Sequence, residues 1–421
     1  MQQLNKLANS DTTVSAQGVD AIAIDELRDT ETYLLGSRFT IDLDHWQSAI
    51  DISQSEASLT SGGNPFSAQG FFSEQDASWQ FNGDLNRAPD FSVSPFPTPT
   101  ALKAHFLGRF DGDTHDRIQA LDWSNTVTYP WLGAEHWQGG IHVERRSKAY
   151  THLEIPYPRN CAYCGRINSF NNETLSQLGL SADELFIPVQ ANHNFAGGIG
   201  GTFPRQWYDY DIDTLITVLE SDAFIHQGAL VGEEISRRLQ GVGFSAQTQP
   251  ASYQVNERIR SAFIEASWGG EFSFLNALKI PETIKNITEA ASWQLTLGSQ
   301  YSHTTTTNYG TATPIADISR ASDDDQLNIT FGPEHAISTQ ANYEMWLPFA
   351  NATFRAGDHV IRAAYNHTIT RPNLQDLGQQ TQIVPRAGSA NVFRGNVALK
   401  PYRTQNYDGA YEYYFLSLIH I

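Results

Sequence analysis

The sequence predicts an all-β protein whose long antiparallel strands form part of a transmembrane β-barrel, and three observations lead to this fold class. Many segments alternate between apolar and polar residues with a period of two, as strands with one apolar face do. The connections between these segments are alternately short and long. No run of about 18 apolar residues is present, which excludes a transmembrane helix.

The clearest alternation lies between His359 and Phe415. In its first half, apolar or aromatic residues occupy every second position until Pro372, which cannot donate a hydrogen bond to a sheet. From Tyr407 onwards, aromatic residues alternate with acidic and small ones. A barrel wall that is apolar towards lipid and polar towards its lumen has this pattern. Alternation alone fits a soluble antiparallel sheet with one wet face better, so both folds stay open at this point.

Other alternating segments come earlier in the chain. They lie at 39–43, 46–52, 121–129, 137–143, 253–268, 293–301 and 343–355. With the two halves of the stretch above, they predict about nine strands. The turns near Asp44, Pro130 and Gly357 are expected to be tight.

The remaining connections differ strongly in length. The one at 269–291 is intermediate, and the others are long, at 55–115, 150–252, 302–340 and 371–400. The longest contains helical pieces, with capping-box spacing at Ser181–Glu184 and a helix-like stretch at 212–239. Short turns at one rim and long loops at the other are typical of outer-membrane barrels, where they are periplasmic and extracellular respectively.

The composition limits the classes of protein to which the chain can belong. Aromatic residues make up 12% of the 421 residues and charged residues 17%, and the mean hydropathy is −0.38. Strands with one apolar face, joined by long polar loops, give this balance. The formal net charge of −19 argues against a nucleic-acid partner.

Motifs in the last part of the chain resemble a known family. The strand that contains Arg362–Tyr365 and continues to Ile369–Pro372 is followed by Gly395–Asn396, Leu399–Tyr402 and Asn406–Asp408. In this order and spacing, the motifs resemble late barrel segments of TonB-dependent outer-membrane receptors, most of all the proteobacterial branch often linked to sugar uptake. Earlier segments, among them 139–146 and 253–268, resemble the family more loosely, so the resemblance covers most of residues 35–415.

The resemblance implies an outer-membrane receptor of a Gram-negative bacterium that binds a scarce nutrient and imports it with energy delivered by TonB. Its partners would be outer-membrane lipid, TonB and a small ligand, with a glycan favoured over a siderophore or other metal chelate. No cofactor and no enzymatic activity are expected.

The resemblance also predicts how the chain is divided. Residues 36–415 would be a partial barrel, residues 1–35 an unassigned remnant, and residues 416–421 a non-native tail. The family's N-terminal plug, coupling box and final strands have no visible counterpart, and the N-terminus lacks an apolar signal core. We therefore expect a fragment that does not close a barrel of about 22 strands on its own.

Two other classes of protein compete with this interpretation. A secreted all-β carbohydrate-active enzyme or binding module would have paired carboxylates in a cleft and polar residues on both exposed sheet faces. A passive porin would lack the plug and the large loops. The sorting of the loops by length opposes the enzyme, and loop length together with the late motifs opposes the porin.

Aromatic residues in the longest connection are candidate ligand contacts. Trp207, Tyr208 and Tyr210 lie beside acids and amides, a combination that suits contact with a sugar or an aromatic ligand. Packing of a folded loop on itself explains these residues equally well.

Cys161 and Cys164 are the only cysteines and have the C-x-x-C spacing. A redox role requires a thioredoxin-like unit, and a four-cysteine zinc site requires a second pair, neither of which the sequence contains. A disulfide that pins a loop in an oxidising compartment is favoured.

Other candidate sites lack the pattern that their chemistry requires. His136 and His142 would share one strand face about 20 Å apart, too far for one metal ion, and His193 fits no ligand set. The glycine-rich stretch 197–202 lacks the lysine of a phosphate loop, and the acidic run 323–325 lacks the glycine of a calcium loop. No nucleophile-elbow motif is present, so we expect no metal site and no catalytic residue.

Overall fold

The computed structural model forms two compact units, each assembled from segments that are distant in sequence. Unit 1 comprises residues 1–28, 60–112 and 153–248, and unit 2 comprises residues 29–59, 113–152 and 249–421. The described residues are 11–26, 28–61, 67–82, 88–110, 112–156, 158–165, 168–191, 201–227, 229–271, 291–312, 314–320, 327–379, 381–384 and 391–414. Within these ranges no helix is both long and apolar enough to cross a membrane.

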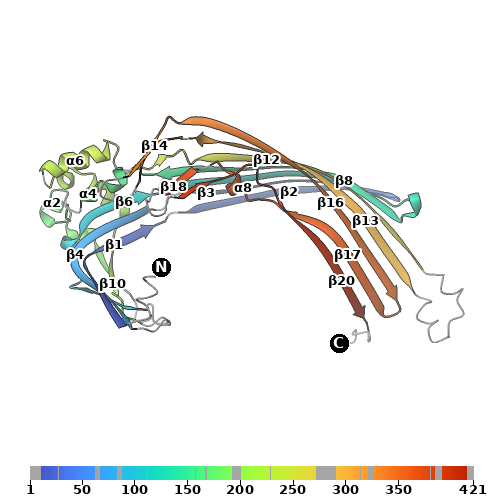
Figure 1. Ribbon diagram of the computed structural model, residues 1–421, viewed down its shortest axis with the longest axis horizontal. Helices are drawn as coiled ribbons and strands as arrows, with labels where there is room; N and C mark the ends of the chain where they lie inside the picture. Colours follow the sequence, from blue (N-terminus) through green and yellow to red (C-terminus); the bar gives the residue numbers. More distant parts are fainter. Residues whose placement is uncertain are drawn as a thin grey trace. The chain divides into compact units, whose positions relative to one another are not determined.

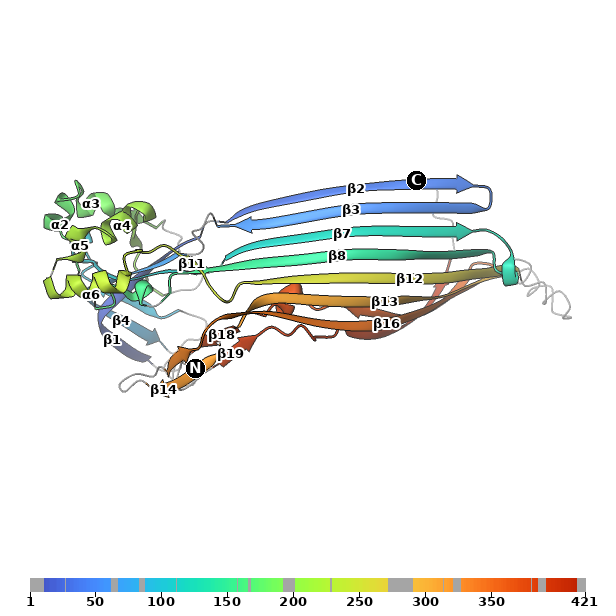
Figure 2. The same cartoon turned by 90° about the horizontal axis from the view of Figure 1, so that it is seen from above.

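Unit 2 is built around one broad sheet, whose strands run side by side in both views (Figure 1, Figure 2). The chain places its strands in the order β2-β3-β7-β8-β12-β13-β16-β17-β20, so each strand pairs with the next along this path. Their bounds are Asp29–Leu43 (β2), Trp46–Thr60 (β3), Gly112–Val127 (β7), His136–Glu154 (β8), Tyr253–Glu271 (β12), Ser292–Ala312 (β13), His335–Ala356 (β16), His359–Thr370 (β17) and Tyr402–Tyr413 (β20). This path confirms the expected number of strands. No ladder among the described residues joins β2 to β20, so the sheet is open.

The tight turns of unit 2 fall where the sequence predicts them. Asp44 and His45 join β2 to β3, and Gly357 and Asp358 join β16 to β17. Gly357 has a φ of 57°, a conformation that glycine adopts at no steric cost. The short helix η2, Trp131–Gly133, connects β7 to β8. Because consecutive strands are neighbours in the sheet, these turns share one end of it and the long connections leave from the other.

Several strands extend beyond the ends that alternation predicts. β2 begins at Asp29, ahead of the expected boundary at residue 36. The two ends of the predicted loop 302–340 belong to β13 and β16. A hairpin of β14, Ile315–Arg320, and β15, Leu327–Phe331, lies between those two strands. The loop prediction was wrong because the threonine-rich run in β13 favours strands but has no apolar face, so the period-two signal disappears there.

Unit 1 contains a second, four-stranded sheet with the order β1-β4-β5, in which β6 also pairs with β4. The bounds are Asp11–Asp25 (β1), Ser67–Asn82 (β4), Asp90–Ser94 (β5) and Lys103–Arg109 (β6). Residues 11–25 had no predicted element, and the prediction of 55–115 as loop was wrong. These strands are rich in small polar residues, and β1 finds its partner β4 far along the chain, so local patterns could not reveal them.

Short helices complete unit 1. They are α2 (Asn172–Ser176), α3 (Ala182–Leu185), α4 (Ile212–Leu219), α5 (Asp222–Ile225) and α6 (Ala229–Leu239). The capping box predicted at Ser181–Glu184 is present at the start of α3. The helix-like stretch 212–239 is three helices, because the Ser221 side chain accepts a hydrogen bond from the backbone of Phe224 and starts a new helix.

A continuous apolar core holds unit 1 together. Phe170 is fully buried, and its ring centroid lies 4.9 Å from those of Phe186 and Phe224. Phe71 of β4 packs edge-on against Phe186 at 5.3 Å. From α4, Leu215, Val218 and Leu219 are buried with the spacing of one helical face. The long connections therefore form a folded unit with its own interior.

Candidate functional site

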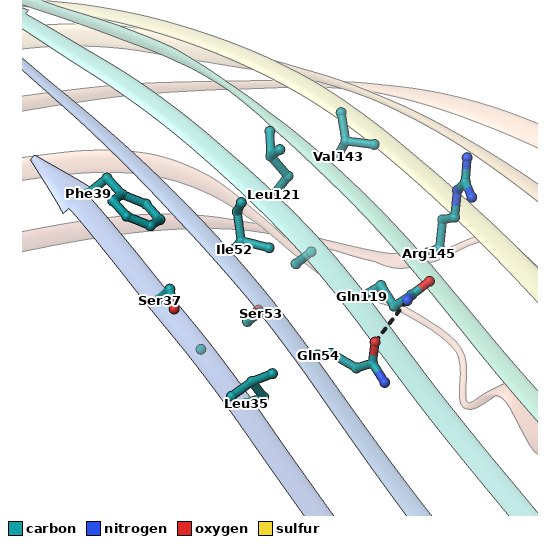
Figure 3. A pocket seen from close by; sticks show the side chains of 12 residues that line it. Leu35, Ser37, Phe39, Ile52, Ser53, Gln54, Gln119, Leu121, Val143 and Arg145 are labelled. Atoms are coloured by element: carbon teal, nitrogen blue, oxygen red, sulfur yellow. Dashed lines mark hydrogen bonds between the residues drawn. The ribbon is translucent and has the colours of Figure 1, made fainter.

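One face of the unit 2 sheet, here called the outward face, carries an apolar band. Ala262 and Ile264 project from this face of β12, and Ile141 of β8 is the register partner of Ala262. Ile264 is 58% exposed, although it lies in the middle of a strand. Figure 3 shows the same band crossing four strands at Phe39, Ile52, Leu121 and Val143. A contiguous apolar surface of this kind indicates a partner other than water.

Aromatic side chains border the band near the short turns. Trp131 and Trp137 lie 5.0 Å apart, and Trp137 lies 6.2 Å from Trp268. The Trp137 indole donates to the backbone carbonyl of Trp131, and the Trp268 indole donates to that of Leu132. Trp137 and Trp268 thus keep the apolar body of the ring on the sheet surface and satisfy its polar edge, as aromatic residues at a membrane interface do.

Further aromatic side chains lie on the outward face of the strands that follow β12 in the sheet. Tyr301 of β13 contacts Trp346 of β16 at 5.1 Å, and Tyr365 of β17 contacts Tyr407 of β20 at 5.0 Å. An exposed apolar band bordered by aromatic side chains is typical of the surface that a transmembrane barrel presents to lipid. The outward face is therefore the lipid-facing side of the unit 2 sheet, which is called the wall below.

The opposite face of the same strands is polar. Glu257 of β12 is only 2% exposed, and its Oε2 lies 3.3 Å from Nη1 of Arg146 on β8. Thr306 of β13 also donates to Glu257, at 3.4 Å. Glu257 and Arg146 were not predicted as a pair from the sequence, although parity along the strands would have placed both residues away from lipid. A buried carboxylate requires such partners, because an unpaired charge there is very costly.

The segment that follows β17 folds back over this polar face. The helix α8, Leu374–Leu377, packs Leu374 and Leu377 against Tyr253 and Val255 of β12. The Arg371 guanidinium donates to the Ser302 hydroxyl at 3.3 Å. The residues just after β17, which were predicted to begin a loop, are therefore held against the polar face of the sheet.

Among the described residues, the histidines considered as metal ligands do not form a metal site. His142 lies on the polar face, with its Nδ1 2.6 Å from Asp122 Oδ1 and its Nε2 3.6 Å from Glu144 Oε2. Across the described part of the chain, no group of three or more His, Cys, Asp or Glu side chains is arranged to hold a metal ion. His193, most of the glycine-rich stretch 197–202 and the acidic run 323–325 lie outside the described residues.

The predicted aromatic ligand contacts lie together on one hairpin of unit 1. The hairpin pairs β9, Ile187–Gln190, with β10, Gln206–Asp209. Tyr208 donates to the backbone carbonyl of Pro97 at 2.9 Å, and Tyr210 donates to Gln69 at 2.7 Å.

These three aromatic residues have different surroundings. Tyr208 and Tyr210 are half-buried against the core of unit 1, and burial raises the pKa of both phenols. Trp207 is 44% exposed, on the other side of the strand. The triplet is thus divided into two anchors and one surface residue.

Cys161 and Cys164 are joined by a disulfide next to the short helix η3, Arg159–Cys161. The Arg238 guanidinium of α6 donates to the Cys161 carbonyl at 3.0 Å. Arg159 is buried and donates to the backbone carbonyls of Gly243 and Ser245, both at 3.0 Å. The disulfide therefore lies at a point where several segments of unit 1 are tied together.

The comparison with known families agrees with the lipid-facing wall and its polar inner face. The family model described as TonB dependent receptor-like, beta-barrel matches residues 25–419. No curated protein and no solved structure matches the chain. Proteins of the matched family reside in the outer membrane of Gram-negative bacteria, where they are nutrient receptors and transporters and not enzymes. The family model covers nearly the whole chain, and the unit 2 sheet has a lipid-facing side. The chain belongs to the TonB-dependent receptor β-barrel family.

Proposed function

We propose that this receptor takes up a glycan rather than an anionic metal chelate, and that the exposed side of the β9–β10 hairpin contacts it. The observation that carries the proposal is the division of the aromatic triplet. Trp207 and Asp209 project on one side of β10, while Tyr208 and Tyr210 hold the other side on the core. A rigidly held aromatic ring on a folded surface loses little conformational entropy when a ligand binds.

The chemistry of this surface suits a neutral sugar. The exposed indole of Trp207 offers a flat apolar area for the C–H face of a sugar ring. Asp209 lies two residues away on the same side and can accept hydrogen bonds from hydroxyl groups. Ile187, its register partner on β9, is also exposed and extends the apolar area.

Electrostatics point in the same direction. The chain carries a formal net charge of −19, and such a field slows the approach of anionic ligands. Many metal chelates are anionic, whereas most glycans are neutral. A carboxylate beside the aromatic ring adds to this preference, because an anionic ligand on Trp207 would lie close to Asp209.

We also propose that the Cys161–Cys164 disulfide persists in the mature protein. An extracellular position of unit 1 would keep the pair oxidised. The bond would hold η3 against α6 through the Arg238 contact and so stabilise the unit that carries the hairpin.

Ligand binding to the purified full chain tests the proposal. Neutral oligosaccharides and ferric chelates would be titrated into wild-type protein, into Trp207→Ala and into the control Trp131→Ala, which removes another exposed indole, from unit 2. We expect an oligosaccharide to saturate the wild type and the control, and Trp207→Ala to weaken its binding by roughly tenfold or more. Saturation by a ferric chelate alone would refute the glycan proposal. Oligosaccharide binding that Trp207→Ala leaves unchanged would refute the β9–β10 hairpin as the contact site.

A further inference from the structure

Three arginines lie on the outward face just beyond the apolar band, on the side of the long connections. On β8, Arg145 follows Val143 at the next outward position, and on β12, Arg260 and Arg258 follow Ala262. All three are exposed. Figure 3 shows Arg145 beside Val143 at the edge of the apolar depression, where glutamine side chains replace aliphatic ones. The arginines therefore mark the boundary between the lipid-facing surface and polar surroundings.

Two of these arginines face each other directly. Arg258 and Arg145 are register partners on neighbouring strands, so their Cβ atoms are separated by only about 5 Å. Like charges in this position destabilise a sheet. Within the described ranges, none of the three guanidinium groups makes a hydrogen bond or ion pair with another side chain. The described residues therefore do not compensate this pair of like charges.

The neighbouring acids cannot supply the missing charge. The outward positions of β8 and β12 hold no acidic residue. Two strands away on either side, Glu56 of β3 is engaged by His115 and Arg117, and Glu344 of β16 lies 3.4 Å from His303. Three unneutralised cations in one place are unexpected in a chain of net charge −19.

The surface around the arginines is shaped as a groove. It has a volume of about 490 Å³ and is lined by Arg117, Arg145, Arg146, Arg258, Glu257 and uncharged polar side chains, including Ser147, Asn256 and Thr305. The Glu257 carboxylate is already paired with Arg146. These side chains can donate further hydrogen bonds to an oxyanion. The arginine guanidinium group has a planar fork that matches phosphate with two parallel hydrogen bonds.

We propose that Arg145, Arg258 and Arg260 bind the phosphate groups of an anionic lipid in the leaflet on the side of the long connections. A lipid is the occupant that fits, because the groove is continuous with the apolar band. One amphipathic molecule can lay its acyl chains on Val143 and Ala262 and its headgroup on the arginines. The inference rests on the membrane-spanning wall and is independent of the glycan proposal.

Binding of lipid A to the full chain in neutral detergent micelles tests this site. The probes are phosphorylated lipid A, the same lipid without its phosphates, and inorganic phosphate. The variant Arg145→Gln/Arg258→Gln removes two cations from the groove. The matched control, Arg38→Gln/Arg355→Gln, removes two exposed arginines from the opposite face of the sheet.

We expect the wild type and the control to bind phosphorylated lipid A, and the groove variant to bind it roughly 30-fold more weakly, since each cation near an anionic surface contributes about a factor of five. Dephosphorylated lipid should bind the wild type and the groove variant alike, and Arg145→Lys/Arg258→Lys should retain part of the affinity. Binding of phosphorylated lipid that the groove variant leaves unchanged would overturn the proposal. Inorganic phosphate that binds as tightly as the lipid would overturn the choice of a lipid.

The melting temperature in lipid-free neutral detergent provides a second readout. A purely structural role of the arginines would make it fall when one of them is replaced. Because Arg258 and Arg145 repel each other without a lipid, Arg258→Gln should leave the melting temperature unchanged or raise it. A clear fall would show that the arginines support the fold itself and would contradict the proposal. Oligosaccharide binding measured on the same variants should stay at the wild-type level, so failure of the lipid site and failure of the glycan proposal can be told apart.

Discussion

The two units of this chain place apolar residues in opposite ways. In unit 1, large side chains such as Phe170 and Phe186 are fully buried in a common core. In unit 2, side chains of the same kind, such as Phe39 and Ile264, are more than half exposed on the outward face of the sheet, while Glu257 and Arg146 lie on the inner face. Unit 1 is organised for water and the unit 2 wall for lipid, and both arise from strands and turns of one sequence.

This difference determines where a substitution matters. In unit 1, the interior is close-packed, so loss of a side chain leaves a cavity. On the outward face, lipid chains can fill the same space, and polarity becomes the decisive property.

Removal of one phenylalanine from each unit should give the largest contrast. Phe170→Ala in the core of unit 1 should lower the free energy of unfolding of that unit by about 3–5 kcal/mol, because its neighbours cannot close the cavity. Phe39→Ala, at a residue that is 63% exposed on β2, should have a much smaller effect in detergent. Urea unfolding followed by tryptophan fluorescence measures both, and equal losses would show that Phe39 also lies in a packed interior.

A new charge should destabilise the protein on the outward face of the wall and should be tolerated on the inner face. Ile264→Arg on the outward face of β12 should destabilise the inserted protein by about 2–4 kcal/mol, because it places a cation in the apolar band. The control Gln294→Arg puts the same charge on the inner face of β13, where it should be tolerated. Refolding into vesicles under a denaturant gradient reports both values. A tolerated Ile264→Arg would mean that this face meets water.

Acid should produce the smallest effect and should act on unit 1. Hydrogen bonds from the Thr214 hydroxyl and backbone amide lower the pKa of Asp211, the N-cap of α4, below its ordinary value of 3.8. The carboxylate therefore contributes stability above that ordinary value, and the contribution disappears as the pH falls through the lowered pKa. Melting of unit 1 as a function of pH should show this loss in the wild type and not in Asp211→Ala. Identical pH profiles for the two proteins would exclude the cap as its source.

Strand alternation and loop length predict the wall and fail for unit 1. The strands near His359 and Tyr407 can be predicted from the sequence because lipid requires one apolar face, which creates a period of two. Short and long connections alternate along the sequence because sequential strands are neighbours in this sheet, so the alternation can also be recognised without the structure. The late motifs point to the same family that the family comparison identifies.

The strands of unit 1 were missed because their partners are distant. β1 pairs with β4, and β4 also pairs with β6, so no segment reveals its strand character by its own periodicity. Loop-like composition in 55–115 hides these pairings. The roles of Tyr208 and Tyr210 could not be separated from that of Trp207 either, since only the three-dimensional core decides which side of β10 is buried.

Lipid accessibility along β12 tests the central claim most directly. Nitroxide labels would be placed one at a time at residues 260–265 of the chain inserted in vesicles, and their relaxation by oxygen and by a water-soluble nickel complex would be compared. The account predicts a period of two, with oxygen favoured at Ala262 and Ile264, and not at Ser261, Phe263 or Glu265. Equal access of the nickel complex to both sets of positions would contradict a lipid-facing wall.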